Sequence, residues 1–490
     1  MLIQSRLAAA LACLAVSVSA LAQSGAPAPR AATPRGNPTQ RPAEPPPPES
    51  LPVPTGQPMT IDFNADPVLR LRRGQSGQEL FRTIIVSAVE NHPSTLESAA
   101  SEDEAVAALE EARMRRLPTI DLSVTSYRVL SRDFSNDPFN VIERSRPRQR
   151  TDALINVTQT IFDFGATTQR ILSAGARLRG ASADIEVNAD RTALNAIAAW
   201  YDVFAFRALV SLTEAFAASQ RDLRAAVQIR VREGVSADGD VPRVDSYIAQ
   251  AETRLARFRR QLAGAEARFT ELTGYPPPAD INRAPIPPVG AATRDEAAAA
   301  AARHAAVRSA EAVADASRRD ARAARADRLP NLSAGVDAGR YGVIENDRDY
   351  DIRGRVALRY RIFGAGDATA EQYEARARAA SARADRTREE AERDAAIAWS
   401  DVRALEQQLE ALESAYIASR RSRDVIAERF RAARGTLFDV VAAEDAYFES
   451  ATAYIQAVTE LDAARWVLLS RMGRLLDALE IDRDRLRGEG

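Results

Sequence analysis

Narrow stripes of apolar residues at helical spacing run through two very long segments of the chain, residues 166–233 and 367–434. In the second segment, Ile397, Leu405 and Leu409 follow such a stripe, with alanines between them. Both segments are rich in Ala, Arg, Glu and Leu, which favour helix. Roughly 65 residues at 1.5 Å each give a helix on the order of 100 Å long, more than a globular domain needs. The pattern predicts two long helices that pack closely, as in a coiled coil.

Alternation of apolar and polar residues with a period of two marks four shorter runs, 120–129, 155–161, 332–337 and 352–362. In the fourth run, one face carries Ile352, Val356, Leu358, Tyr360 and Ile362, and the other carries Arg353, Arg355, Arg359 and Arg361. Such alternation over about ten residues is typical of a strand in a membrane β-barrel. If the apolar face meets lipid, the arginines line a water-filled lumen and predict a mild preference for anions. A soluble sheet with one solvated face is the alternative.

Landmark residues recur along the chain in the same order. The recurring pairs are His92 and His304, Pro118 and Pro330, Trp200 and Trp399, and Gly274 and Gly473. One long unit is therefore present twice, which indicates a tandem repeat. We expect the first repeat at residues 77–290 and the second at 291–480, followed by a charged tail at 481–490.

Each repeat predicts the same series of elements. A helical arm ends at a Leu-Pro pair, two strands follow, and a long helix leads through a short turn into a returning helix. Gly274 and Gly473 stand where the returning helices should end. The arms span 79–116 and 295–328, and the turns span 234–240 and 435–439. The expected fold class is mainly α with a membrane β-barrel portion, in which tandem helical hairpins carry four strands per chain.

The first 22 residues have the pattern of a signal peptide. Arg6 precedes a short apolar core, residues 7–18, and an Ala-Leu-Ala cleavage site ends at Ala22. The only cysteine, Cys13, lies inside this segment. Acylation of Cys13 is the alternative, but Ala10 stands where a lipoprotein usually has leucine. The mature chain is thus expected to lack cysteine, and it shows no run of about 18 apolar residues that would predict a membrane helix.

Residues 23–76 form a proline-rich linker and N-terminal segment that includes Pro45–Pro48. Such a segment cannot bury a core and is expected to be extended. A proline motif that binds a partner is the alternative.

Composition excludes several classes of function. The formal net charge of −2 gives no electrostatic argument for nucleic acid. No P-loop, dinucleotide-binding fingerprint or nucleophile elbow occurs, so we expect no enzyme activity and no cofactor. The two histidines have no cysteine or carboxylate cluster beside them, so we expect no metal site.

Four strands per chain cannot close a barrel, because the smallest common barrel has about eight. Open strand edges are not tolerated in lipid. The strands must therefore join strands of other copies. Two copies would give eight strands and three would give twelve, and the residues alone do not choose between them.

Strand pairs between long helical arms, in two tandem copies over residues 80–476, resemble the TolC family of outer-membrane efflux and secretion proteins. Local motifs add to the resemblance: Ile161-Phe162-Asp163-Phe164-Gly165, Ile362-Phe363-Gly364-Ala365-Gly366, and Gly435-Thr436-Leu437-Phe438-Asp439-Val440-Val441. The resemblance implies a homotrimer with a twelve-stranded barrel in the lipid of the outer membrane of a Gram-negative bacterium. It also implies a helical periplasmic tunnel that stays closed at its tip until a periplasmic adaptor (a membrane fusion protein) and an inner-membrane ABC or RND transporter engage it.

By position, Asp240 and Asp439 match the aspartates that constrict the periplasmic tip in family members. Arg243 and Ala442 stand where the family often has a second aspartate, so the constriction is thinner here or is rebuilt by Asp238 and Glu444. A ring of carboxylates holds cations or takes up protons. Helix capping is the alternative role.

The resemblance implies export of substrates by type I secretion or by tripartite efflux. The missing lipidation favours the secretion branch, although the sequence does not specify the cargo. A soluble periplasmic coiled-coil adaptor or scaffold is the alternative function. Adaptors usually carry domains of dense short strands, and the chain shows none.

Overall fold

The computed structural model describes residues 62, 65–132, 139, 141, 145–345, 349–432 and 434–486, without the side chains of residues 483 and 484. The expected signal peptide and most of the proline-rich linker lie outside the described residues. So does the end of the charged tail. All described residues belong to one unit of the chain, residues 47–490.

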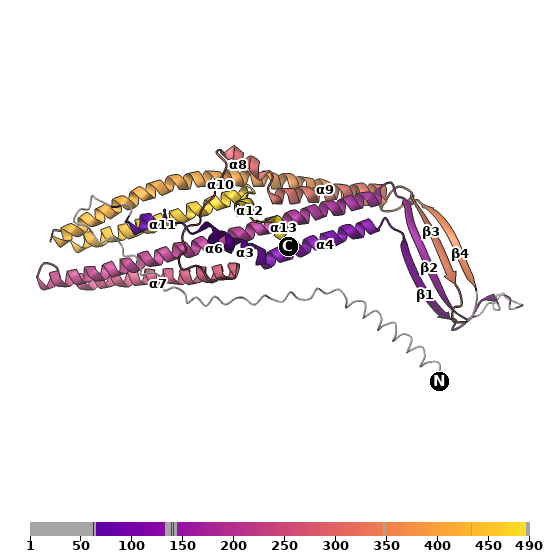
Figure 1. Ribbon diagram of the computed structural model, residues 1–490, viewed down its shortest axis with the longest axis horizontal. Helices are drawn as coiled ribbons and strands as arrows, with labels where there is room; N and C mark the ends of the chain where they lie inside the picture. Colours follow the sequence, from indigo (N-terminus) through magenta and orange to yellow (C-terminus); the bar gives the residue numbers. More distant parts are fainter. Residues whose placement is uncertain are drawn as a thin grey trace, which may run out of the picture. The chain divides into compact units, whose positions relative to one another are not determined.

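Two very long helices dominate the described unit (Figure 1). They are α6 (Ala166–Arg232) and α10 (Gly366–Arg431), and each turns into a returning helix, α7 (Asp240–Thr273) or α11 (Leu437–Arg471). The prediction of long helices that double back is confirmed. Both returning helices end beside the expected glycines, which take positive φ angles of 74° at Gly274 and 69° at Gly473.

The helical arm of each repeat is broken in two, which the sequence pattern does not predict. The first arm forms α3 (Gln78–Asn91) and α4 (Pro93–Met114), and the second forms α8 (Arg294–Ala301) and α9 (Ala305–Ala326). His92 and His304 lie at the breaks, where each ring accepts a hydrogen bond from a backbone N–H two residues on. The expectation of one continuous arm is therefore wrong. Each histidine caps a new helix instead.

Four antiparallel strands form one sheet in the order β1-β2-β3-β4. The strands are β1 (Thr119–Arg128), β2 (Gln149–Phe162), β3 (Asn331–Arg340) and β4 (Tyr350–Arg359). Arg359 pairs with Asn331, the first residue of β3, and β4 ends there. Arg361 and Ile362 were expected inside the strand but lie beyond it. The preceding residue on the β3 side is Pro330, which has no N–H to extend the ladder.

Helices α4, α6, α9 and α10 lie side by side in one layer, and the sheet lies beyond one end of this layer (Figure 1). Helix α7 packs on α6, and α11 packs on α10, at the other end of the molecule. Gly180 of α6 lies against α9, where a Cβ would be 3.7 Å from that of Ala312, an ordinary contact distance.

An aromatic core joins the two repeats midway along the helices. The Phe81 ring centroid lies 5.2 Å from that of Trp200 and 5.5 Å from that of Trp466, and Trp200 lies 6.1 Å from Phe269. All four side chains are buried. Three short helices lie at this level, α2 (Pro67–Arg70), α12 (Leu475–Ala478) and α13 (Arg483–Leu486).

Helix α6 has an 18-residue window apolar enough, by composition, to cross a membrane. This is an average over the window and not an unbroken run of apolar residues, so it does not contradict the expectation that no such run exists. In addition, 56% of the window is buried within the protein, as in a core helix.

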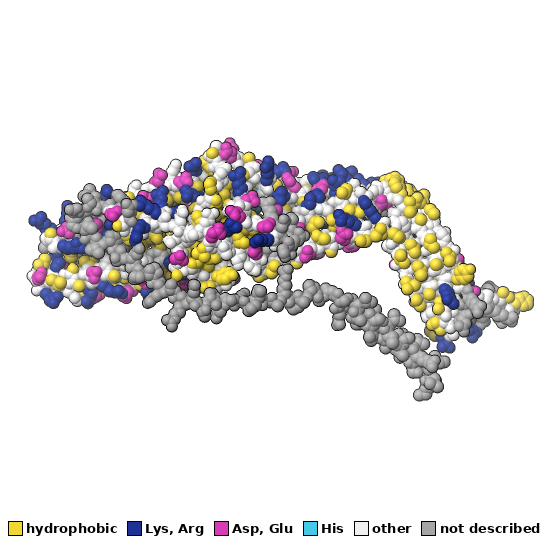
Figure 2. Space-filling view, viewed as in Figure 1, with side chains coloured by type: hydrophobic (Ala, Val, Ile, Leu, Met, Phe, Trp, Pro, Cys, Tyr) yellow, Lys and Arg dark blue, Asp and Glu magenta, His cyan; other side chains and the backbone are white. Residues whose placement is uncertain are grey.

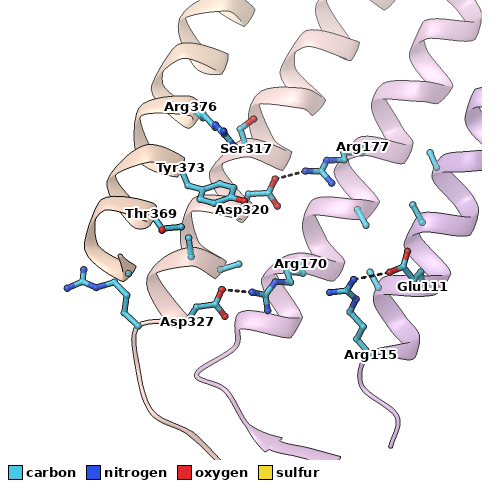
Figure 3. A pocket seen from close by; sticks show the side chains of 18 of the residues that line it. Glu111, Arg115, Arg170, Arg177, Ser317, Asp320, Asp327, Thr369, Tyr373 and Arg376 are labelled. Atoms are coloured by element: carbon cyan, nitrogen blue, oxygen red, sulfur yellow. Dashed lines mark hydrogen bonds and ion pairs between the residues drawn. The ribbon is translucent and has the colours of Figure 1, made fainter. Parts of the chain in front are cut away.

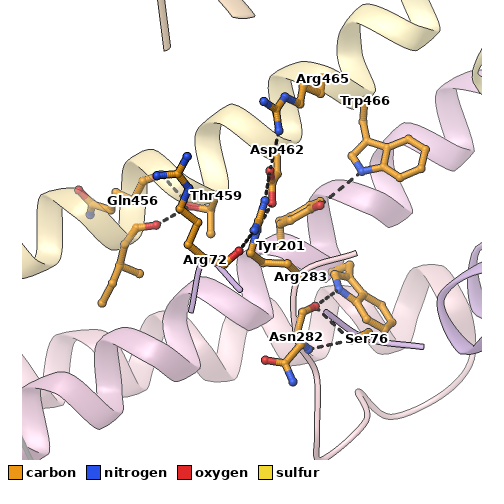
Figure 4. Close-up of polar contacts among 12 residues, drawn as sticks. Arg72, Ser76, Tyr201, Asn282, Arg283, Gln456, Thr459, Asp462, Arg465 and Trp466 are labelled. Carbon is orange, nitrogen blue, oxygen red and sulfur yellow. Dashed lines mark hydrogen bonds and ion pairs between the residues drawn. The ribbon is translucent and has the colours of Figure 1, made fainter. Parts of the chain in front are cut away.

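The connection between the repeats is tied to α11 by buried charges (Figure 4). Nε of Arg283 donates to Asp462 at 2.5 Å and its Nη2 donates to the second carboxylate oxygen at 2.7 Å. Asp462 is fully buried. Burial lowers the pKa of Arg283, but the hydrogen bonds and the charge of Asp462 outweigh this effect and hold that pKa above its ordinary value. Such a two-point pair fixes the connection in a single register on α11.

The segment before α3 is anchored on α10 by a second buried charge. Asp66 caps α2 and also accepts hydrogen bonds from the Tyr416 hydroxyl at 2.8 and 3.0 Å, while Arg420 pairs with the same carboxylate. All three side chains are buried, and burial beside these partners raises the pKa of Tyr416. We call Asp66, Tyr416 and Arg420 the strap anchor.

Candidate functional site

One face of the sheet is a continuous apolar surface. Leu122, Ile155, Ala338 and Ile352 form one row directly across the four strands. Figure 2 shows hydrophobic side chains gathered over the sheet, whereas charged side chains are spread over the helices. Val356 is 75% exposed and Ile352 is 67% exposed. An apolar face of this extent is unusual for a surface that meets water.

The opposite face of the sheet is polar. Asp121, Asn156, Asp337 and Arg353 form a row across the same four strands. Arg353 pairs with Asp351, and Nη2 of Arg355 lies 3.7 Å from the carboxylate of Asp337. Three of the four expected lumen arginines, Arg353, Arg355 and Arg359, lie on this face of β4, while Arg361 lies past the strand end.

An open groove of about 960 Å³ lies in the helix layer next to the sheet (Figure 3). Residues from all four helices α4, α6, α9 and α10 line it, so the layer is hollowed on this face. Alanines form much of the surface, and six arginines reach it: Arg115, Arg170, Arg177, Arg328, Arg361 and Arg376. We call it the arginine groove.

Most of these arginines are neutralised by nearby carboxylates. Arg177 donates to Asp320 at 2.6 Å, Arg115 donates to Glu111 at 2.9 Å, and Arg170 pairs with Asp327 (Figure 3). Arg328 pairs with Asp367. Within the described part of the chain, Arg361 and Arg376 have no carboxylate within ion-pair distance. The guanidinium of Arg376 lies 5.2 Å from the ring centroid of Tyr373.

Arg361 lies just beyond β4 and lines the groove beside Arg328 and Gly366. It is the last member of the alternating arginine series of the fourth run. Because residues 360–365 are not strand, the alternation of β4 does not fix the side to which Arg361 points.

The two helical turns lie together at the end opposite the sheet (Figure 1). A separate apolar cluster joins them, made of Val227, Val244, Phe430, Leu437, Val440 and Val441. Nη1 of Arg230 donates to the Phe430 carbonyl at 2.6 Å, and the guanidinium lies 4.2 Å from the Phe430 ring. The hairpin tips of the two repeats are therefore packed as one body.

Asp439 lies in a capping box at the start of α11. Its carboxylate accepts from the Thr436 hydroxyl at 2.7 Å and from the Thr436 backbone N–H at 3.2 Å, and the Thr436 hydroxyl accepts from the Asp439 N–H. These hydrogen bonds hold the pKa of Asp439 below its ordinary value. The carboxylate is exposed and charged, so it satisfies the helix end and also places a negative charge at the tip.

Asp240 is the first residue of α7 and is partly exposed at the same end of the molecule. The N-cap residue of α7 is Gly239, which has no side chain that could accept a capping hydrogen bond. The structure thus brings both aspartates to one end.

Glu444 cannot rebuild an acidic constriction, contrary to one expectation. It is buried on α11, 3.8 Å from Nη1 of Arg423, and burial raises its pKa. Arg423 is buried as well and pairs with Asp424 at 2.7 Å. Asp238, in contrast, is exposed in the turn.

Among the described residues, no group of three His, Cys, Asp or Glu side chains could hold a metal ion. The two histidines act as helix caps instead. Burial, with the nearby charge of Arg471, lowers the pKa of His304, which keeps its ring a neutral acceptor.

Sequence reasoning missed the arginine groove. The spacing of Ala105, Ala108 and Ala112 on α4 indicates a face of small residues. No pattern in the sequence shows, however, that this face lies next to α6 and α9. The one available signal was the continuation of the arginine alternation to Arg361.

Comparison with known proteins finds a family match over part of the chain. The family of outer membrane efflux proteins matches residues 84–275. Among solved structures, the outer-membrane channel OprN has 18% sequence identity and a TM-score of 0.71, with 82% of this chain and 91% of that chain covered.

Two further channels have the same fold. The outer membrane protein VceC from Vibrio cholerae has 17% identity and a TM-score of 0.69, with 80% of this chain and 96% of that chain covered. The open state of the MtrE outer membrane channel from Neisseria gonorrhoeae has 17% identity and a TM-score of 0.64, with 83% and 90% covered. A search of curated protein sequences finds no significant match. At these identities the structural likenesses establish the fold.

Proposed function

Because residues 84–275 match the outer membrane efflux protein family and the fold matches that of solved outer-membrane channels, we propose that the chain belongs to this family and is one of three identical subunits of an export channel. The protein is an outer-membrane protein with a periplasmic extension. The sheet is its membrane part, and the helices form a tunnel wall in the periplasm.

The single observation that carries this proposal is the two-faced sheet. Its strands are ten to fourteen residues long, enough to cross a bilayer when tilted. Aromatic side chains are exposed near both ends, with Tyr350 at one end and Tyr360 and Phe363 at the other. An apolar band between aromatic girdles is typical of barrels in the outer membrane. The arginine face then lines the lumen.

The trimer follows from the open edges. Strands β1 and β4 are the two edges of the sheet, and each leaves backbone N–H and C=O groups unpaired within the chain. Lipid does not tolerate such edges, so β4 of one copy pairs with β1 of the next. Twelve strands from three copies agree with the family resemblance.

The packed hairpin tips form the periplasmic end of the tunnel. Three copies place six aspartates, Asp240 and Asp439 of each chain, around the axis of that end. Their repulsion is relieved when the ring widens or binds cations. The tip is also the end that an adaptor and an ABC or RND transporter can reach, in type I secretion or in tripartite efflux.

A soluble adaptor is the alternative function. The exposed apolar face of the sheet disfavours it, because an adaptor would present that face to water. The channel is tested by fractionation followed by planar-bilayer recording. We expect an oligomer in the outer membrane that resists heating in detergent and conducts ions after purification. A monomer in the soluble periplasmic fraction would exclude the channel.

A further inference from the structure

We propose that the arginine groove is an anion-binding site in the export path, located in the helix layer below the barrel. The ligand class is a solute that carries phosphate or carboxylate groups. This inference rests on the proposed channel, because it requires the hollow face of the layer to be the lumen. It goes further by assigning a substrate chemistry to residues outside the β-sheet.

The position of the groove places it in the path. The groove is hollowed into the face that α4, α6, α9 and α10 share. If these four helices are one third of a closed tunnel wall, their hollowed face is the lumen side. A solute that crosses the tunnel passes this groove immediately before it enters the barrel.

The charges of the groove are unevenly spread between its walls. On the α4 and α6 side, arginines are matched by carboxylates, such as Arg115 with Glu111 and Arg177 with Asp320. On the α10 side, Arg361 and Arg376 have no carboxylate partner among the described residues. One lining carboxylate, Glu104 on α4, is likewise without an arginine in that part of the chain. The wall formed by the start of α10 is therefore the positive one (Figure 3).

Each of the two guanidinium groups on this wall can donate two parallel hydrogen bonds to a phosphate or carboxylate group. Tyr373 and Thr369 line the same wall with hydroxyl groups that can donate as well. The Arg376 guanidinium group stacks on the Tyr373 ring, and this contact orients it. With three copies around one axis, the wall is repeated three times.

The test is block of the purified channel in a planar bilayer by inorganic triphosphate added on the barrel side. We expect the wild-type channel to be blocked. The Arg361→Gln/Arg376→Gln variant should need at least about fivefold more triphosphate for half block, because two charges per subunit are removed. The Arg361→Lys/Arg376→Lys variant should recover part of the block. Citrate is the second probe, and it distinguishes carboxylate recognition from a requirement for phosphate.

The matched control is Arg378→Gln. Arg378 lies on the same helix two residues after Arg376, roughly 200° around it, so it faces away from the groove. Its half-block concentration should equal that of the wild type. The Arg353→Gln/Arg355→Gln variant measures what the barrel arginines contribute.

The inference is overturned by any of the following results. If a conducting Arg361→Gln/Arg376→Gln channel is blocked as strongly as the wild type, the groove is not the anion-binding site. An equal loss in the Arg378→Gln control, or a loss confined to the barrel variant, excludes it as well. If the wild-type protein forms no channel at all, the proposed function fails and this inference fails with it. A heat-resistant oligomer on gels shows that each variant is assembled.

Discussion

At the scale of single residues, Asp439 has two separable roles. Its carboxylate completes a capping box, and it also carries an exposed charge at the tip. Replacement by alanine removes both, so a change in conductance alone would not distinguish them. Asparagine keeps an oxygen for the cap and removes only the charge.

We predict that Asp439→Asn weakens block of the channel by divalent cations on the periplasmic side by about fivefold, without loss of the oligomer. Asp439→Ala should weaken block equally and also destabilise the helix start, because the capping box is lost. Single-channel recording and thermal melting measure the two effects. Asp385→Asn, a loss of charge at an exposed position in the first half of α10, is the control. Unchanged block in Asp439→Asn would leave capping as the only role of this residue.

Asp190 is a second residue whose charge matters. It is mostly buried, and desolvation raises its pKa to about 6, although the Ser470 hydroxyl donates to it at 2.5 Å. In the unfolded chain the carboxyl loses its proton near pH 4. Between about pH 4 and pH 6, the Asp190 carboxyl is deprotonated in the unfolded state but still protonated in the folded state. The free energy of unfolding therefore falls as pH rises through this range.

We predict that Asp190→Asn raises the stability of the protein at pH 7.5 by up to about 2 kcal/mol, because the buried charge is gone. At pH 4 the advantage should vanish, since Asp190 is then neutral in the folded wild type. The temperature at which the oligomer dissociates, compared between variant and wild type at each pH, measures this. A gain that is equal at both pH values would show that burial of the charge is not its cause.

At the scale of elements, neighbouring positions of one strand should differ in their tolerance of charge, because one side chain faces lipid and the next faces water. Val356 and Ala357 are neighbours on β4 that point to opposite faces of the sheet. We predict that Val356→Arg reduces the amount of assembled protein in the outer membrane, because arginine on the lipid face costs about 2–4 kcal/mol near the bilayer centre. Ala357→Arg should be tolerated. Both are measured as heat-resistant oligomer, and equal loss in both variants would argue against the assigned faces.

The long helices and the strands could be predicted because each has one dominant period over many residues. The breaks at His92 and His304 could not be predicted from periodicity, since the apolar pattern continues through them. Pro93 signals the first break, because the residue before a proline avoids helical geometry. The second break has no such signal, since Ala305 follows His304. Tertiary packing against the turn that follows α11, where a Cβ on Gly473 would lie 3.3 Å from Cα of His304, accompanies it.

The candidate site divides in the same way. Arg353, Arg355 and Arg359 could be placed on one face because a strand alternates strictly. Asp240 and Asp439 could be placed at turns because glycines mark the ends of the helices before them. The burial of Glu444 could not be foreseen, because it depends on the side chain of Arg423 on a neighbouring helix.

At the scale of the whole molecule, closure of the barrel can be measured directly. The chain's one cysteine, Cys13, lies in the expected signal peptide, so new cysteines meet no background. We predict that a Ser123→Cys/Ala357→Cys chain, with one thiol on each edge strand, cross-links through a flexible bismaleimide between copies. Denaturing gels should then show dimers and trimers and no larger species. The position of the largest band counts the copies, and a ladder beyond three would contradict the trimer.

The control for this experiment uses two strands that pair within one chain. Ser123 lies directly opposite Leu154 in the register of β1 and β2. A Ser123→Cys/Leu154→Cys chain should therefore cross-link internally and run as a monomer. If the edge pair also gives only monomers, the edges do not meet between copies.

The strap anchor holds α10 near the tip and far from the sheet, so α10 can act as a lever with two unequal arms. Arg420 lies 11 residues before the end of the helix at Arg431, about 17 Å, whereas roughly 80 Å of helix lie between Arg420 and the sheet. If α10 turns as a rigid rod about that fulcrum, a shift of 5 Å at the barrel moves the tip by only about 1 Å. Force applied at the short arm, in contrast, moves the tip directly. The barrel can therefore yield to its cargo or its membrane with little effect on the far end, and opening is left to whatever grips the periplasmic tip.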